Sequence, residues 1–229
     1  MIASTVLASM MIVVFALLPF HTRYSLSRTY ARFNLWALRV LCGIHYQVQG
    51  AENIPGGPAI VLSKHQSTWE TLALQVLFPP QVYVLKRELL RVPFFGWGLA
   101  LLKPISINRG AGRKAVEQVV DQGTARLRDG LWVIVFPEGT RIPAGQQGRY
   151  KLGGAVLAAA SGYPVVPVAH NSGLFWPRRQ FLKRPGTIQV VIGSPIESTG
   201  REAADILKEA ETWIEGHAQP LARGRAGNG

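Results

Sequence analysis

Two short apolar runs with no polar interruption constrain the fold of this chain of 229 residues more than any other feature. They are residues 59–62 (Ala-Ile-Val-Leu) and residues 131–136 (Leu-Trp-Val-Ile-Val-Phe). A strand with one face in water alternates apolar and polar side chains, whereas a strand covered on both faces of a parallel sheet is apolar throughout. Both runs are too short for an ordinary helix. They therefore predict buried strands of a largely parallel sheet.

Strand-like and helix-like segments alternate along the rest of the chain. Shorter strands are expected at residues 46–49, 82–86, 105–108, 165–169 and 187–192. Helices are expected at residues 71–77, 111–128, 151–160 and 201–216, and residues 89–102 should form a broken apolar segment on the surface. Such alternation is typical of an α/β sandwich, so we expect a mixed, largely parallel sheet of about seven strands flanked by helices.

The N-terminal segment has a different character. Residues 2–20 are apolar except for Ser4, Thr5 and Ser9, and one helix of that length reaches about 30 Å, close to the thickness of a bilayer core. Residues 26–42 predict an amphipathic helix whose arginines and aromatic rings suit the lipid headgroup layer. The alternative is that both segments are ordinary core helices. We expect membrane-associating helices at residues 1–43, the α/β domain at residues 44–220 and a flexible tail at residues 221–229.

The charge balance favours an anionic partner. The chain has 25 Lys and Arg against 13 Asp and Glu, a net charge of +12. Nucleic acid, an acidic carrier protein and anionic lipid all fit this charge. No zinc-finger spacing, RNA-binding aromatic strand or basic heptad helix is present, so nucleic acid is not expected. Arginines concentrate after the N-terminal apolar run, which favours an anionic bilayer. We expect the inner membrane, with the α/β domain on its cytoplasmic face.

A histidine and a carboxylate follow the first apolar run. His65 can serve as a general base near neutral pH, and Glu70 can fix its tautomer and orientation. Polar groups at the end of a strand of an open α/β sheet lie where such sheets bind ligands. Residues 67–70 (Ser-Thr-Trp-Glu) also match a capping box, in which Glu70 contacts the Ser67 amide. A third interpretation makes Ser67 a nucleophile, although an N-cap explains it better.

The second apolar run is followed by a second polar group, Glu138-Gly139-Thr140-Arg141. Arg141 can bind a phosphate through two hydrogen bonds, and Gly139 allows a ligand to approach the backbone. Lys86, Lys103 and Arg109 follow or flank other predicted strands and can complete an anion pocket. The alternative is a turn with solvated charges. Pro167, inside a late strand, is expected to shape the sheet beside the site.

Together these motifs resemble those of the glycerophospholipid acyltransferase family, and of its 1-acyl-sn-glycerol-3-phosphate acyltransferases in particular. The histidine-x4-acid block is similar to His65 through Glu70, and the Pro-Glu-Gly-Thr-Arg block matches residues 137–141. Two weaker blocks resemble residues 95–109 and 166–168, and all four occur in the family's order. One residue departs from the pattern, because the family usually has aspartate where this chain has Glu70.

The resemblance implies transfer of a fatty acyl group from acyl-CoA or acyl carrier protein to the 2-hydroxyl of lysophosphatidic acid, giving phosphatidic acid. It implies that His65 takes the hydroxyl proton and that Glu70 orients His65. The phosphate and glycerol would be held by Arg141, Arg109, Lys86, Glu138, Gly139 and Thr140. Neither a metal nor a cofactor is expected. The alternatives are another lyso-lipid acceptor, such as a lyso-ornithine lipid, or a non-catalytic protein that binds anionic lipid.

Overall fold

The computed structural model describes residues 2–14 and 16–223, without the side chains of Ile2, Ile12 and Arg109. Its seven strands form one sheet in the order β1-β7-β6-β2-β5-β3-β4. All neighbouring strands are parallel except β6 and β7. The predicted mixed, largely parallel sheet is therefore confirmed. The strands are β1 (Ile44–Gln49), β2 (Ile60–Ser63), β3 (Gln81–Lys86), β4 (Ile105–Ile107), β5 (Trp132–Val135), β6 (Val165–His170) and β7 (Gly186–Ile192).

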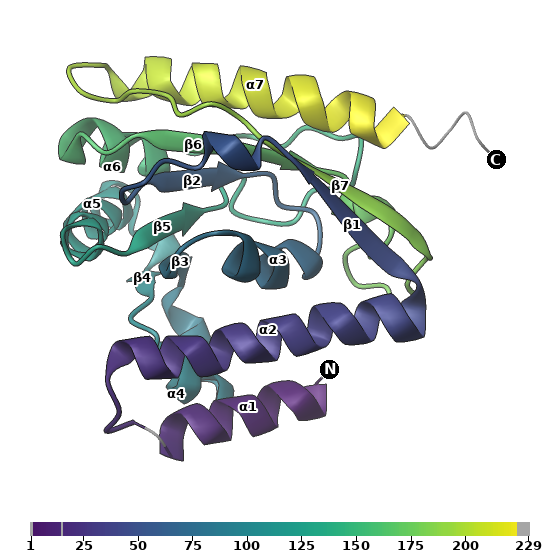
Figure 1. Ribbon diagram of the computed structural model, residues 1–229. Helices are drawn as coiled ribbons and strands as arrows, with labels where there is room; N and C mark the ends of the chain where they lie inside the picture. The colour runs from purple at the N-terminus through teal and green to yellow at the C-terminus, as the bar shows by residue number, and fades with distance from the viewer. Residues whose placement is uncertain (1, 15, 224–229) are drawn as a thin grey trace.

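Helices cover both faces of this sheet, as Figure 1 shows. Helices α5, α6 and α7 lie on one face, α2 and α3 lie on the other, and α1 and α4 form a further layer outside α2 and α3. The helices are α1 (Ile2–Val14), α2 (Phe20–Cys42), α3 (Trp69–Leu77), α4 (Phe95–Ala100), α5 (Arg113–Arg128), α6 (Gly153–Ser161) and α7 (Ala203–Arg223). Short 3-10 turns are η1 (Ala51–Asn53), η2 (Arg87–Arg91), η3 (Arg109–Ala111) and η4 (Ser172–Leu174).

The two apolar runs form the centre of the sheet. In β2, Ile60 and Leu62 belong to the core under α5, α6 and α7, whereas Val61 belongs to the core under α2 and α3. β5 alternates in the same way, with Val133 on the first face and Ile134 on the second. Both faces of these strands are buried, and this is why the runs at residues 59–62 and 131–136 contain no polar side chain.

The expectation of one helix across residues 2–20 is wrong. α1 ends at Val14, and α2 begins at Phe20 directly after Pro19, its N-cap residue. Proline fits the start of a helix but not its interior, because it lacks an N–H group and clashes with the preceding turn. Among the residues that the structure describes, no helix combines the length and the apolar character needed to cross a bilayer.

α2 is integrated into the domain more closely than its amphipathic pattern indicated. The Tyr24 ring is buried, and its hydroxyl donates to the carbonyl of Gln75 at 3.4 Å. Arg28 donates from Nη2 to the carbonyl of Val76 at 2.8 Å. Both carbonyls lie in the last turn of α3, where backbone acceptors lack intrahelical partners. These contacts fix α2 against α3, so the N-terminal helices and the α/β domain pack together.

The last helix is longer than expected. α7 continues through Pro220 to Arg223, past the predicted end at residue 216 and into the segment expected to be a tail. The rest of that predicted tail, residues 224–229, lies outside the described residues. Ile206, Ala210 and Ile214 of α7 are completely buried in the core on their side of the sheet.

Candidate active site

The predicted polar groups meet at one edge of the sheet because their strands are neighbours and run in parallel. His65 follows β2, residues 137–141 follow β5, and Lys86 ends β3. β5 pairs with both β2 and β3, so all three strands end on the same side. The amide of Ile142 donates to the carbonyl of His65 at 2.8 Å, which ties the first two loops together.

His65 and Glu70 are in direct contact. Nδ1 of His65 lies 2.9 Å from Oε1 of Glu70, an ionised carboxylate that can only accept. Nδ1 therefore carries the hydrogen in the neutral ring, and Nε2 keeps a lone pair able to take a proton. The imidazole stacks on the Phe136 ring with their centroids 4.1 Å apart. This arrangement fixes both the tautomer and the plane of the histidine.

Glu70 also caps the helix that carries it. Its Oε1 accepts from the amides of Gln66 at 2.9 Å and Ser67 at 2.7 Å, so the same carboxylate oxygen makes both the capping contact and the contact with the imidazole. Ser67 is buried, and its hydroxyl accepts from the Trp69 amide at 3.1 Å. This contact matches the helix-starting role expected for Ser67 rather than that of a nucleophile facing a substrate.

The pKa of Glu70 reflects these contacts. Burial by itself raises the pKa of this carboxyl, but the hydrogen bond with His65, the nearby rings of His170 and His65 and the Ser67 amide outweigh it and lower the pKa to about 2. The side chain is fully buried. Glu70 is thus a permanent anion at neutral pH, as a group that stabilises an imidazolium must be.

Glu138 contacts Lys64 and the loop that carries His65. Its carboxylate is buried and accepts from the ammonium of Lys64 at 2.7 Å and from the backbone amide of His65 at 2.9 Å. Burial raises its pKa, and the hydrogen bond and charge of Lys64 oppose that rise. The Glu138 oxygens face the His65 loop and Lys64, and Glu138 is not among the residues that line the cavity described below, so its contact with the glycerol stays a prediction.

Lys64, in the loop after β2 that carries His65, connects this loop to α7. Its ammonium contacts Oε1 of Glu215 on α7 at 2.6 Å and the carbonyl of Gln146 at 3.0 Å. The Tyr150 hydroxyl donates to the same Glu215 oxygen at 2.9 Å. Lys64 is almost completely buried, so two carboxylates and a carbonyl replace the water that its charge would otherwise require.

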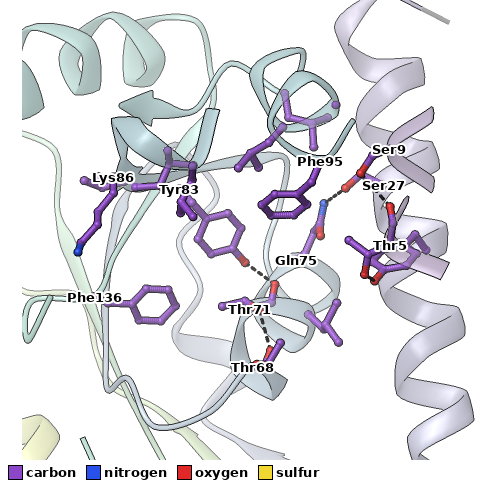
Figure 2. A pocket seen from close by; sticks show the side chains of 18 of the residues that line it. Thr5, Ser9, Ser27, Thr68, Thr71, Gln75, Tyr83, Lys86, Phe95 and Phe136 are labelled. Atoms are coloured by element: carbon purple, nitrogen blue, oxygen red, sulfur yellow. Dashed lines mark hydrogen bonds between the residues drawn. The ribbon is translucent and has the colours of Figure 1, made fainter. Parts of the chain in front are cut away.

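A cavity of about 470 Å³ extends from this edge of the sheet toward the N-terminal helices. His65, Lys86 and Arg141 lie at one end, and Thr5, Ala8 and Ser9 of α1 with Gly98 of α4 lie at the other. Figure 2 shows Tyr83, Phe95 and Gln75 between these ends, and Lys86 beside Phe136. The lining is mainly apolar. Its shape and composition suit a ligand with a charged head and a hydrocarbon chain.

The remaining predicted binding residues are brought together only in part. Gly139 has a φ of 67° and lines the large cavity as well as a smaller apolar one of about 150 Å³ beside Lys151. A Cβ at this position would lie 2.9 Å from Nζ at the flexible end of Lys151, so the positive φ, rather than the space, is what favours glycine here. Thr140 is exposed and lines neither cavity. Arg109 begins η3 after β4, but its side chain lies outside the described part.

Two residues of the site were missed from the sequence. The Ser172 hydroxyl donates to Oε2 of Glu70 at 2.9 Å, and Nε2 of His170 donates to the carbonyl of Lys64 at 2.9 Å. Burial lowers the pKa of His170 against the opposing charge of Glu70. The signal was the polar group His170-Asn171-Ser172, which begins at the last residue of the otherwise apolar strand containing Pro167. This strand, β6, lies between β2 and β7. Its pairing with β7 begins at Val168, one residue after Pro167.

A strand-end histidine held by a carboxylate lines a mainly apolar cavity together with Lys86 and Arg141, an arrangement that suits acyl transfer to a lipid hydroxyl. A family model described as Acyltransferase matches residues 45–171. A 1-acyl-sn-glycerol-3-phosphate acyltransferase of Pseudomonas aeruginosa is 52% identical over 202 residues, which cover 86% of this chain and 79% of that protein. The chain belongs to this acyltransferase family, among the relatives that carry that name.

More distant proteins agree with this assignment. Human 1-acyl-sn-glycerol-3-phosphate acyltransferase beta is 30% identical over 74% of this chain, which spans 62% of the human protein. The crystal structure of the 1-acyl-sn-glycerophosphate acyltransferase of Thermotoga maritima superposes with a TM-score of 0.64 at 20% identity, covering 98% of this chain and 96% of that one. At this level of identity the likeness shows a shared fold.

Proposed function

We propose that this chain transfers a fatty acyl group from a thioester, acyl-CoA or acyl carrier protein, to the 2-hydroxyl of lysophosphatidic acid, giving phosphatidic acid. One observation carries the proposal. His65, with Nδ1 held by Glu70, lines the same cavity as Arg141 and Lys86. A general base and two cations lining one chain-sized cavity match the hydroxyl, the phosphate and the hydrocarbon of this acceptor. The relatives' names give the same acceptor.

In the proposed reaction His65 acts directly on the acceptor. Nε2 removes the proton of the 2-hydroxyl as its oxygen attacks the thioester carbonyl carbon. A carbon–oxygen bond forms, the carbon–sulfur bond breaks, and the departing thiolate takes the proton back from the imidazolium. Glu70 stabilises the imidazolium between these steps, and the Glu138 carboxylate holds the His65 backbone in place. No acyl-enzyme is required, because Ser67 is occupied at the start of α3.

The basic residues are assigned to the phosphate. Arg141 offers a planar fork of donors for a phosphate monoester, and Lys86 contributes a second positive charge. Arg109 and Thr140 are also assigned to the headgroup, from the sequence alone. Gly139 lines both cavities, so a substrate that extends from one cavity into the other would pass this residue. The smaller cavity is about the size that admits benzene, too small for a fatty chain but suited to the arm of a thioester.

The N-terminal helices are assigned to the membrane surface. Large apolar side chains are exposed on α1, α2 and α4, and Arg32 and Arg39 on α2 suit anionic headgroups. An amphipathic helix can lie in the headgroup layer without spanning the bilayer. Arginines after the N-terminal apolar segment support the cytoplasmic face of the inner membrane. The apolar residues are Leu7, Met10, Met11, Val14, Phe33, Trp36, Val40, Leu41 and Trp97.

The proposal is tested with purified protein in phospholipid vesicles. Wild type, His65→Ala and the control His45→Ala, an exposed histidine of β1, are assayed with lysophosphatidic acid and each thioester donor. We expect wild type and the control to form phosphatidic acid and His65→Ala to lose at least a thousandfold in rate while binding vesicles as before. A panel with monoacylglycerol and other lyso-lipids tests the acceptor. Equal turnover without His65, or no preference for the phosphate monoester, contradicts the proposal.

A further inference from the structure

The loop of residues 177–184 (Pro-Arg-Arg-Gln-Phe-Leu-Lys-Arg), between η4 and β7, combines positive charge with exposed apolar side chains. Four of its residues are basic and none is acidic. Phe181 is 89% exposed and Leu182 is 77% exposed. Among the described residues, the other large apolar side chains exposed by three quarters or more are Val14, Leu17 and Leu41. All three belong to the N-terminal segment assigned above to the membrane.

The exposure of this loop has a defined structural basis. The ammonium of Lys183 lies 4.7 Å from the centroid of the Trp176 ring and 5.3 Å from that of Phe181, both within cation–π range. It also donates to the Phe181 carbonyl at 2.8 Å, and the Arg184 amide donates to the Phe175 carbonyl at 2.8 Å. The loop is therefore held in shape while Phe181 and Leu182 extend into solvent, at a cost in free energy unless something covers them.

The position of the loop links two parts of the proposed function. At its C-terminal end, Gly186 donates to the carbonyl of Gly43 at 2.9 Å, which places the end of the loop beside the end of α2. Val40 and Leu41 are exposed on that last turn of α2. At its other end, Nη1 of Arg178 donates to the carbonyl of Arg141 at 3.3 Å. The loop thus extends from the membrane-facing helix to the residue assigned to the phosphate.

We propose that residues 177–184 form a second membrane-contact site, in which Phe181 and Leu182 enter the headgroup layer of an anionic bilayer and the four basic residues bind its phosphates. This inference rests on the membrane association proposed above. Basic residues around an apolar tip are the combination that binds anionic lipid surfaces. An acidic carrier protein would satisfy the charges but would not require two large apolar side chains at the tip. The site would hold the headgroup pocket at the depth where a lyso-lipid lies.

A fluorescent probe tests this directly. In full-length protein with Cys42→Ser, single cysteines replace Leu182, Leu41 on α2 or Lys208 on the outer face of α7, and each carries an environment-sensitive dye. α7 lies on the opposite side of the molecule from α1 (Figure 1). With vesicles containing phosphatidylglycerol, we expect the emission at positions 182 and 41 to shift to the blue and to be quenched by lipids spin-labelled near the headgroup. The probe at position 208 should not respond.

The outcomes separate the two proposals. A response at position 41 without one at position 182 overturns the loop site and leaves the helix assignment intact. A response at position 182 alone supports the loop and contradicts the helices, and no response at either position contradicts both. A probe at position 182 that responds to acyl carrier protein and not to vesicles also overturns the inference. As a second measurement, Phe181→Ser with Leu182→Ser should reduce vesicle cosedimentation about tenfold, and unchanged binding would contradict the loop site.

Discussion

The Ser172 hydroxyl donates a 2.9 Å hydrogen bond to Oε2 of Glu70, the carboxylate oxygen that His65 does not contact. Ser172 lies in η4 after β6, whereas Glu70 lies in the first turn of α3. The contact therefore joins the segment after β6 to the start of α3, next to His65. Both oxygens of the glutamate carboxylate therefore have a partner, Oε1 in His65 and Oε2 in Ser172. In this way Glu70 is held at a position where aspartate is usual in the family.

Ser172→Ala is expected to lower kcat about tenfold with KM for both substrates unchanged, because a hydrogen bond to a charged group is lost behind the base and not in the binding pocket. Ser172→Thr should restore most of the rate. Ser198→Ala, an equally buried serine bonded to the Tyr163 carbonyl, is the control. In a double-mutant cycle with Glu70→Asp, the two effects should be less than multiplicative. Fully independent effects would show that Ser172 does not act through Glu70.

Glu70 also predicts a pH dependence of stability. Its pKa is lowered to about 2 in the folded protein, below that of an unfolded glutamate, so its contribution is present above the unfolded pKa and is lost as the pH falls through the folded pKa. From pH 6 to pH 3 wild type should lose about 1.5 kcal/mol more unfolding free energy than Glu70→Gln. Urea unfolding at a series of pH values measures this. Parallel pH profiles for the two proteins would contradict the assignment.

Lys64→Met is expected to destabilise the fold by about 3–5 kcal/mol, because it leaves the buried carboxylates of Glu138 and Glu215 without their cation. Adding Glu215→Gln should recover part of this loss. Lys103→Met is the control, since Lys103 pairs with Asp129 at the surface at 3.8 Å and should cost less than about 1 kcal/mol. Thermal unfolding measures all three variants. A Lys64 variant as stable as the control would refute a structural role for the buried network.

Arg141→Lys is expected to raise KM for lysophosphatidic acid about tenfold or more, because lysine cannot reproduce the paired donors of a guanidinium. Turnover of monoacylglycerol, which has no phosphate, should not change. Arg149→Lys, an exposed arginine of the same loop, serves as the control. Steady-state kinetics with both acceptors distinguish the cases. An equal effect on the two acceptors would show that Arg141 does not bind the phosphate.

Ala8→Phe is expected to shorten the large cavity at its α1 end, since Ala8 lines it next to Ser9. The ratio of kcat/KM for a sixteen-carbon lysophosphatidic acid to that for a ten-carbon one should fall about tenfold, as an added ring excludes terminal methylenes. Ala3→Phe, on the exposed part of α1, should leave the ratio unchanged. Competition between the two acceptors gives the ratio in one reaction. An unchanged ratio would mean that acyl chains do not reach α1.

The sheet and the position of the site were predictable because they depend on local pattern. Uninterrupted apolar residues at 59–62 and 131–136 required burial on both faces, and polar residues after them had to meet at the parallel strand ends. The direction of Glu138 was not predictable. It depends on Lys64 and on Glu215, which comes 151 positions after Lys64. No local pattern encodes a pair at that separation, so Glu138 was assigned to substrate by its place in the motif.

Ser172 could have been predicted in the same way as His65, from its position at the end of a buried parallel strand. β6 runs parallel to β2, so the polar residues at its end and just beyond it had to lie near the histidine loop. The break at Pro19 was also visible in the sequence, but the apolar composition of residues 2–20 outweighed it in the prediction. In the first case the polar residues at the end of β6 were overlooked, and in the second the position of Pro19 was overlooked.

The pairing of Lys64 with Glu215 has a consequence for how the protein matures on the ribosome. The histidine loop is synthesised before Glu215, which follows Lys64 by 151 positions. Until α7 docks, solvent reaches the ion pair that holds the His65 backbone amide. We therefore expect full activity only after α7 has packed against the sheet.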